Sequence, residues 1–343
     1  ICNSGNANTC NADGIEIAEG MCALAGEALD GVTPILRKRA LREIRRRVLT
    51  PFLDRDDFWW MGQVRRDLCN WTPWIVSNVL CAAQYQMEDP IRLEELVRKS
   101  AAILDLYVGC LPEDGGCDEG TAYWNMAGGS LLDCLESLTE LTGGTVNFYQ
   151  ESKVRQLGLF PVRSHVQGAW FWNFADCDAR PMLDGERLYT YGKRIGSTEL
   201  QALGRYMGIH LVPRDTPQPN RVMNALFTDM LPGSDPGSPA AVNLPQLQVW
   251  ARRNGRMYAV VKGGHNAESH NHNDVGSFMI YADGEPVVID AGNMVYTRKT
   301  FSPERYTLWN TRSMYHNVPL IGPGIEQPAG RAYQARRLSA DSE

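Results

Sequence analysis

The spacing of apolar residues divides the chain into a helical part and a strand-forming part. From residue 35 to about 230, apolar side chains recur at intervals of three and four, as between Ile91 and Tyr107, which is typical of amphipathic helices. After about residue 235 come short β-type runs, LQVWAR, MYAVVK, SFMIYA and PVVID. The last two flank Asp283-Gly284, a dipeptide typical of a tight hairpin turn. The pattern predicts a helical domain followed by an antiparallel β domain.

Helix-breaking residues set the expected boundaries. Thr72 is a predicted N-cap and Pro90 opens the next helix, whereas Ser130 precedes the apolar run LLDCLESLTEL and Gly143-Gly144 ends it. Helices joined by such Gly-rich loops predict stacked helical hairpins, although no sequence repeat is visible. The segment LPGSDPGSP reads as a linker. We therefore divide the chain into residues 1–30, which have a composition of their own, a helical domain over 31–235 and a β domain over 236–343.

Composition narrows the functional classes. The 343 residues are 43% hydrophobic and 22% charged, with a formal net charge of -6, as in an ordinary globular protein. The chain lacks the basic excess that nucleic-acid-binding surfaces show. It also lacks an apolar run of about 18 residues, which would predict a membrane-spanning helix. All nine cysteines lie in the first 177 residues, without a C-x-x-C pair. We interpret them as buried free thiols, which slightly favours a cytoplasmic location over a periplasmic or secreted one.

Histidines and carboxylates cluster in the β domain. His270 and His272 stand two apart, Asp290 follows in VVIDAG and His316 follows in MYHN. Imidazole nitrogen and carboxylate oxygen are ligands of zinc, and residues two apart in an extended segment point to the same side. The set is therefore adequate for Zn2+, but spacing alone favours the alternative of a polar loop whose histidines bond to the backbone, because ligands this far apart match no short metal motif.

A Gly-rich loop and many tryptophans mark the helical half. The loop EDGGCDEGTAYWNMAGG carries Glu119, Tyr123 and Trp124 among its polar and aromatic residues. A tyrosine can serve as a general acid or base, or simply pack on a helix end. Seven of the nine tryptophans lie between residues 59 and 172. Their rings suit the apolar faces of sugars, and the alternative is ordinary core packing.

Together these clusters resemble the heparinase II/III family of polysaccharide lyases. The resemblance runs from about residue 33 to the end, and rests on CNWTPWIVSNVL, LPEDGGCDEGTAYWNMAGGSLLDCLESL, ESHNHNDVGSFMIYADGEPVVIDAG and TRSMYHNVPLI. It implies a multidomain α+β protein, in which a partial (α/α) toroid of helical hairpins precedes a truncated antiparallel β-sandwich. The active cleft would lie between the two, and we expect the chain to be a fragment of a longer bacterial protein.

The resemblance implies cleavage of uronic-acid polysaccharides by β-elimination. It casts Tyr123 as the catalytic acid, and as a candidate base, with His270 as the catalytic histidine and Asn70 as the group that neutralises the uronate carboxylate. Trp71 follows Asn70 where some relatives carry a histidine. His272, Asp290 and His316 resemble the ligands of a structural zinc ion. For contacts to an acidic polysaccharide or oligosaccharide we expect Trp71, Trp74, Glu119, Trp124 and Arg305.

Residues 1–30 resemble a different family. The segment ICNSGNANTCNADGIEIAEGMCALAGEAL looks like the amino-terminal half of the ornithine acetyltransferases. Their self-cleavage motif needs paired threonines, and no Thr-Thr pair occurs here; Thr228 stands alone. We interpret the segment as a spurious join. Three hypotheses follow, in decreasing order: a uronate lyase, a non-catalytic saccharide-binding relative of the same fold, and an acetyltransferase.

Overall fold

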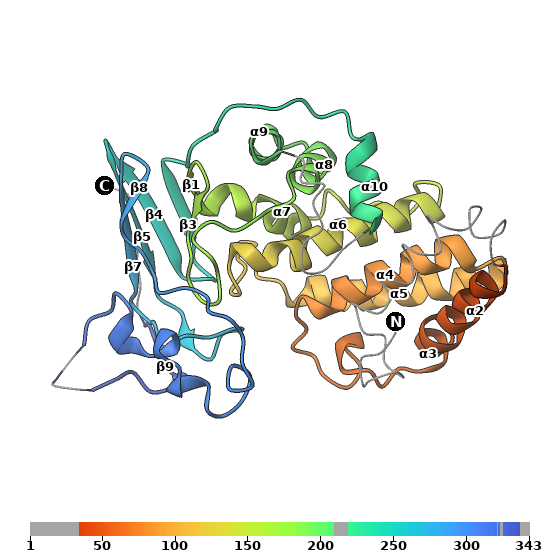
Figure 1. Cartoon of the computed structure of the whole chain (residues 1–343), viewed down its shortest axis with the longest axis horizontal. Coiled ribbons are helices and arrows are strands. Elements are labelled where there is room, and N and C mark those ends of the chain that lie inside the picture. Colours follow the sequence, from red (N-terminus) through yellow and green to blue (C-terminus); the bar gives the residue numbers. More distant parts are fainter. Residues whose placement is uncertain (1–33, 209–218, 321, 323–324, 337–343) are drawn as a thin grey trace.

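The computed structural model describes residues 34–208, 219–320, 322 and 325–336, so the acetyltransferase-like segment lies outside the described residues. A group of helices stands beside a twisted antiparallel sheet (Figure 1). The described helices are α2 (Pro34–Ile44), α3 (Thr50–Asp54), α4 (Trp71–Gln86), α5 (Pro90–Cys110), α6 (Trp124–Leu141), α7 (Ser152–Ser164), α8 (Gly185–Ile195), α9 (Thr198–Met207) and α10 (Pro219–Phe227).

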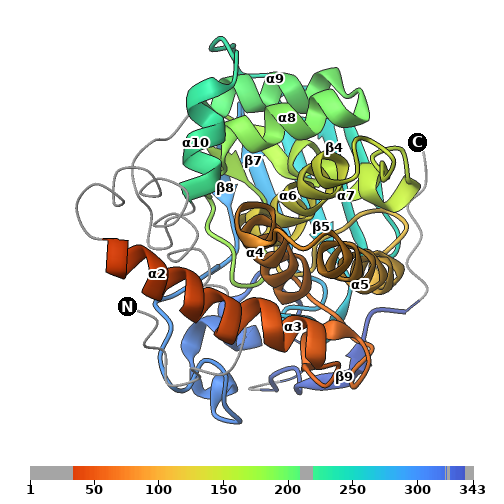
Figure 2. The ribbon, with the colours of Figure 1, turned by 90° about the vertical axis from the view of Figure 1, so that its right-hand side faces the viewer.

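Consecutive helices pair as short-looped hairpins, as the sequence predicts. Helix α5 follows α4 after three residues and packs against it, and α9 follows α8 after two. The N-terminus of α5 is fixed by Asp89, whose carboxylate accepts hydrogen bonds from the backbone N–H groups of Ile91 and Arg92, while Pro90 occupies the first helical position, where no N–H is needed. Figure 2 looks along the helical part and shows α4, α5 and α6 running side by side in front of the sheet.

Two helices begin earlier than predicted. Helix α4 begins at Trp71, so Thr72 is not its cap; the Thr72 hydroxyl instead donates to the carbonyl of Trp60. Helix α6 begins at Trp124, because the 3-10 turn Thr121–Tyr123 continues directly into it. Ser130 therefore lies inside α6, buried, and accepts a hydrogen bond from Arg221. Both hydroxyl groups form tertiary hydrogen bonds in place of helix caps. A local capping pattern in the sequence cannot reveal such contacts.

The β region is a five-stranded antiparallel sheet in the order β3-β4-β5-β7-β8. Asp283 and Gly284 have φ values of +52° and +83°, which a two-residue hairpin of this type requires, and the predicted hairpin is confirmed. The strands are β3 (Ala241–Leu244), β4 (Val249–Asn254), β5 (Met257–Lys262), β7 (Phe278–Ala282) and β8 (Glu285–Val288); the two-stranded pairs are β1 (His165–Gln167) with β2 (Trp170–Phe171), and β6 (His265–Asn266) with β9 (Gly330–Gln334).

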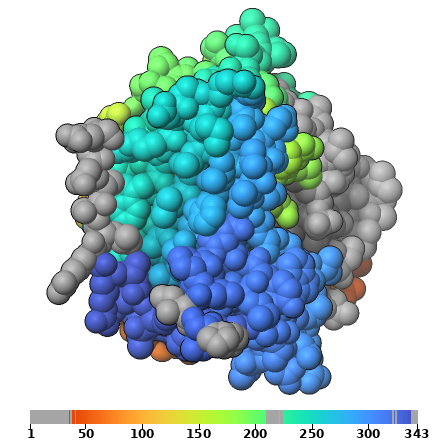
Figure 3. Space-filling view, turned by 90° about the vertical axis from the view of Figure 1, so that its left-hand side faces the viewer, coloured from red at the N-terminus to blue at the C-terminus, as the bar shows by residue number. Residues whose placement is uncertain are grey.

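One face of the sheet packs on the helical part. Strand residues alternate between buried and exposed, and the buried ones, such as Tyr258 and Met279, join one continuous apolar core with the helices. Such burial is the main stabilising contribution to a fold of this kind. The opposite face exposes Met257, Val261 and Phe278 and forms one side of the molecule (Figure 3). The predicted combination of helical hairpins and antiparallel sheet is confirmed.

Other surface features follow the sequence in part. Arg46 and Arg47 both pair with Glu43 at the start of the helical part. Six cysteines lie in the described residues, and all are free. Cys110 is exposed, so the expectation of burial is wrong there. Its thiol donates a hydrogen bond to the carbonyl of Arg66. None of the helices within the described ranges is both long and apolar enough to cross a membrane.

Candidate functional site

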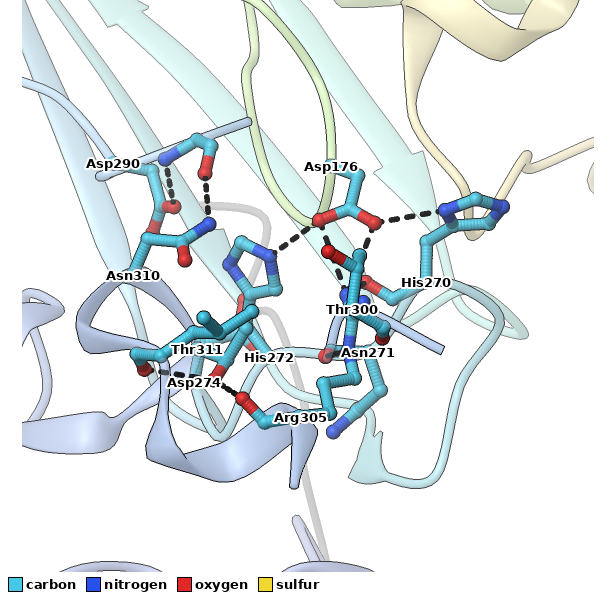
Figure 4. Close-up of polar contacts among 12 residues, drawn as sticks. Asp176, His270, Asn271, His272, Asp274, Asp290, Thr300, Arg305, Asn310 and Thr311 are labelled. Atoms are coloured by element: carbon cyan, nitrogen blue, oxygen red, sulfur yellow. Dashed lines mark hydrogen bonds and ion pairs between the residues drawn. The ribbon is translucent and has the colours of Figure 1, made fainter. Parts of the chain in front are cut away.

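A buried carboxylate organises the junction between the helical part and the sheet. Asp176, in the loop that follows β2, is 2% exposed. His270 and His272 both reach it (Figure 4). They lie in the segment 263–277 that joins β5 to β7 and contains the short strand β6, called the β5–β7 loop below. Nδ1 of His270 lies 2.8 Å from Oδ2, and Nε2 of His272 lies 2.8 Å from Oδ1. Asp176 and two histidines about 95 positions further along the chain thus form one cluster.

Arg305 completes this cluster with its charge. Its Nη2 donates to both Asp176 oxygens, at 3.1 and 3.0 Å. Burial alone would raise the pKa of Asp176, but the hydrogen bonds from His270 and His272 and the Arg305 charge outweigh it and hold the pKa well below its usual range. Asp176 is therefore an ionised carboxylate that accepts hydrogen bonds.

The backbone is in an unusual conformation on both sides of the Asp176–His270 contact. His270 has φ +53°, and Ala175, directly before Asp176, has φ +58°. Residues other than glycine rarely adopt this left-handed backbone conformation, which costs of order 1 kcal/mol or more per residue. Residues held this way concentrate at functional sites, where the surrounding contacts fix them.

Tyr123 lies against His270 from the helical side. It ends the turn before α6, and its ring centroid is 4.3 Å from that of His270. The hydroxyl groups of Tyr123 and Tyr296 are hydrogen-bonded, and the Tyr296 hydroxyl donates to Asp176 at 3.2 Å. Burial raises the pKa of Tyr123 to about 12, although the bond to Tyr296 opposes the shift. The phenol is therefore protonated at neutral pH.

Asn70 and Glu119 form a second polar pair nearby. The Asn70 amide donates to the Glu119 carboxyl group, and both side chains are buried. Burial raises the pKa of Glu119 to about 8, and the charge of Asp118 adds to this. Both residues line a cavity of about 280 Å³ that extends to Ser269, the residue before His270. The cavity wall comes from helical-part loops and from the β5–β7 loop together.

Three of the predicted residues form a compact group that suits a metal ion. Single ligand atoms of His272, Asp290 and His316 lie within 4.8 Å of one another, and all three residues are buried. Among the described residues, Nδ1 of His272 is a buried nitrogen without a hydrogen-bond partner. Nδ1 of His316 lies 2.8 Å from Asp290, and its Nε2 lies 2.8 Å from the carbonyl of Asn310. An orphaned imidazole nitrogen facing a carboxylate and a second imidazole is the donor set that zinc takes.

The structure buries two of the residues that the sequence predicts to contact substrate. Trp124 is 0% exposed, and its indole N–H donates to the carbonyl of Leu157, so its ring belongs to the core of α6. The Arg305 guanidinium is also buried: besides Asp176 it donates to the carbonyls of Thr300, His270 and Asn271. Through these bonds it ties the loop that carries His270 to Asp176.

The remaining aromatic residues behave differently. Trp71 is 39% exposed, with its ring centroid 5.6 Å from that of Trp74 and 6.0 Å from that of Trp59. Because Trp71 directly follows Asn70, this half-exposed cluster stands at the edge of the Asn70–Glu119 pair. Glu119 lines the cavity, and its carboxyl group accepts a hydrogen bond from Asn70.

Sequence reasoning missed Asp176 and Tyr296. Asp176 stands in the segment FADCDAR, and Tyr296 follows VVIDAG by a few residues. Neither has a local motif, because their role depends on contacts to residues about 95 to 173 positions away. An aromatic residue in a polar loop near VVIDAG was the only available signal for Tyr296, and Asp176 had none.

Comparison with known proteins places this site in context. Residues 237–322 match the family Heparinase II/III-like, C-terminal, and no curated protein sequence matches the chain. A solved heparinase III structure superposes with a TM-score of 0.66 at 14% identity, covering 93% of this chain and 48% of that one. A second heparinase III gene product gives 0.59 at 14% identity, covering 90% and 44%.

A mutant of the heparan sulfate lyase from Pedobacter heparinus also superposes, with a TM-score of 0.55 at 13% identity, covering 89% of this chain and 44% of that one. The chain spans less than half the length of these solved proteins. It therefore has the heparinase III fold over that length, and its β region carries the heparinase II/III-like C-terminal domain. The resemblance drawn from the sequence is confirmed at this level.

Proposed function

We propose that this chain carries the catalytic centre of a polysaccharide lyase that cleaves uronic-acid glycans by β-elimination. The observation that carries the proposal is the contact between Tyr123 and His270. It joins an acid–base tyrosine of the helical part to a histidine of the sheet part, beside a cavity lined by Asn70. Residues from both parts of a fold that meet at one cavity are the usual arrangement of an enzyme site.

The reaction needs one base, one acid and one carboxylate-binding group. A base takes the proton from C5 of the uronate, the electron pair of that C–H bond forms the C4–C5 double bond, and the C4–O bond breaks. An acid gives a proton to the departing oxygen. Negative charge develops toward the uronate carboxylate, so a donor aimed at that group lowers the barrier.

The described residues supply these roles. The protonated phenol of Tyr123 is an acid for the leaving oxygen. Because Nδ1 of His270 faces Asp176, Nε2 is the ring nitrogen left to take a proton, and it forms no hydrogen bond among the described residues. Asn70 has an amide N–H that can neutralise a uronate carboxylate. Glu119, with its pKa near 8, carries little negative charge at neutral pH to repel that group.

We further propose that His272, Asp290 and His316 hold a zinc ion with a structural role. The ion would bind the β5–β7 loop to the segment around residue 316, and so stabilise the loop that carries His270. The support is the fit described above: an orphaned Nδ1 on His272 and a backbone acceptor that orients His316. Oriented imidazoles of this kind are typical of zinc ligands.

An ultraviolet elimination assay tests the lyase. The full chain is incubated with heparan sulfate, hyaluronan, chondroitin and alginate, and their oligosaccharides, and the absorbance of the unsaturated uronate is followed. We expect absorbance to rise with at least one glycan, and its rate to fall about 10²- to 10⁴-fold in Tyr123→Phe, as for loss of an acid–base group. Tyr333→Phe, on strand β9, is the matched control and should keep the activity.

Two outcomes oppose the proposal. Absorbance that rises equally in Tyr123→Phe removes this residue from the chemistry. A folded, zinc-loaded protein that binds one of these glycans in a calorimeter, but never produces unsaturated uronate, is the non-catalytic saccharide-binding relative.

A further inference from the structure

Asp176 serves two histidines that have different expected tasks. Its Oδ2 faces Nδ1 of His270, and its Oδ1 faces Nε2 of His272, both at 2.8 Å. Figure 4 shows the carboxylate between the two rings, with the second nitrogen of His270 turned away from it. The contacts use opposite ring nitrogens of the two histidines, and that difference carries the inference.

An ionised carboxylate only accepts hydrogen bonds, so each nitrogen that faces it carries a proton. Arg305 keeps Asp176 ionised by donating to both oxygens. His270 is thereby held with a proton on Nδ1 and a free lone pair on Nε2. His272 is held the opposite way, with a proton on Nε2 and a free lone pair on Nδ1.

Each lone pair then lies where a different chemistry needs it. The His270 side chain is 17% exposed, and Nε2 is the ring nitrogen that Asp176 does not bind. Nδ1 of His272 is the buried, partnerless nitrogen in the group with Asp290 and His316. A carboxylate that binds one nitrogen of an imidazole fixes the orientation and the tautomer of the ring.

We propose that Asp176 is a positioning residue that sets both tautomers at once, and so couples the candidate catalytic histidine to the candidate metal group. The catalytic half rests on the proposed lyase function, whereas the tautomers themselves do not. The carboxylate comes from the helical part and both histidines come from the β5–β7 loop, so the same bonds fix how that loop meets Tyr123. The backbone is left-handed at His270 and at Ala175, the residue directly before Asp176.

The decisive variant is Asp176→Asn, with Asp178→Asn as control. Asp178 is exposed and lies two residues away, so its substitution tests the same chemical change outside the cluster. An asparagine offers one oxygen and one N–H2 group. It can accept from one histidine, but toward the other it donates, and that ring must move its proton to the other nitrogen.

The first measurement is 15N NMR of the histidine rings in the full chain, with His270→Gln and His272→Gln used to assign the signals. We expect the wild-type protein without metal to show His270 protonated on Nδ1 and His272 protonated on Nε2. In Asp176→Asn one of the two should reverse, and in Asp178→Asn neither. Wild-type rings with the opposite tautomers, or tautomers unchanged in Asp176→Asn, would overturn the proposal, and the wild-type result stands even where Asp176→Asn fails to fold.

The second measurement follows function and metal separately. Zinc affinity of Asp176→Asn should fall roughly 10- to 100-fold, as for loss of other groups that orient metal ligands, and kcat should fall by a similar factor while KM changes little. Asp178→Asn should change none of these. If one tautomer reverses in Asp176→Asn but the wild type shows no elimination activity, the positioning role stands and the lyase function is rejected. Unchanged zinc affinity in Asp176→Asn would overturn the coupling to the metal group.

Discussion

The amide of Asn70 donates a hydrogen bond to the carboxyl group of Glu119, in the wall of the cavity between the helical part and the sheet. Both side chains are buried. Burial, with the charge of Asp118, raises the pKa of Glu119 to about 8, so at neutral pH the pair is largely an amide and a neutral acid. The site that we propose to accept an acidic sugar is thereby freed of one negative charge.

This raised pKa makes stability depend on Glu119 in a defined pH range. Between about 4.5 and about 8 the folded protein keeps a proton on Glu119 that the unfolded chain releases, so the free energy of unfolding falls as the pH rises through this range. The slope due to this group is at most about 1.4 kcal/mol per pH unit. Glu119→Gln removes the proton equilibrium and should flatten the dependence, as measured by urea unfolding at pH 5, 6, 7 and 8.

Glu113→Gln is the control for this experiment, because Glu113 is exposed in the same loop region. Its profile should match the wild type. Equal slopes in the wild type and in Glu119→Gln would show that Glu119 is ionised in the folded protein, and would contradict the raised pKa.

Asn70 should matter for turnover more than for folding. Asn70→Ala removes the donor proposed to bind the uronate carboxylate, and removal of one such donor costs about 10²- to 10³-fold in kcat. We expect this loss in the elimination assay, with the thermal midpoint lowered by only a few degrees. Asn78→Ala, about two turns further along the chain in α4 and also buried, should keep kcat. A kcat for Asn70→Ala within threefold of the wild type would remove Asn70 from the mechanism.

The metal group gives a prediction that needs no substrate. His316→Ala should abolish stoichiometric zinc in the purified protein, measured by mass spectrometry of the metal, and should lower the unfolding midpoint. The chelator-treated wild type should show the same midpoint. His265→Ala is the matched control, since His265 lies outside the group of three; it should retain zinc. Wild-type protein purified with added zinc but containing none would reject the proposed ion.

What the sequence could predict follows from how local each signal is. The Asp283-Gly284 hairpin and the helix opened by Pro90 were predictable, because a turn or a cap depends on neighbouring residues. The group of His272, Asp290 and His316 was proposed from residue types and from a family resemblance, and the structure brings its members together. Asp176 was not predictable: it is one aspartate among many, and only the packing of the loop after β2 against the β5–β7 loop gives it two histidines and an arginine.

The same reasoning explains why one predicted tryptophan contact is buried in the core and another is exposed. Trp124 and Trp71 lie in equally polar and aromatic sequence, and composition cannot tell a core ring from an exposed one. The structure separates them, at 0% and 39% exposure. An indole N–H bonded to the Leu157 carbonyl fixes Trp124 in the core, whereas the ring of Trp71 lies against Trp59 and Trp74.

Substitution of these two residues should therefore have opposite effects. Trp71→Ala removes a face on which a sugar ring can stack, and should raise KM about 2- to 10-fold, equivalent to roughly 0.5–1.5 kcal/mol for an aromatic contact, with little change in unfolding. Trp124→Ala should cost about 3–5 kcal/mol of stability by leaving a cavity in the core. Steady-state kinetics on the glycan found active, with urea unfolding of both variants, distinguishes them. In Trp124→Phe the new ring fills most of the space of the indole. A raised KM in this variant, with an unchanged KM in Trp71→Ala, would show that the glycan does not bind beside Asn70.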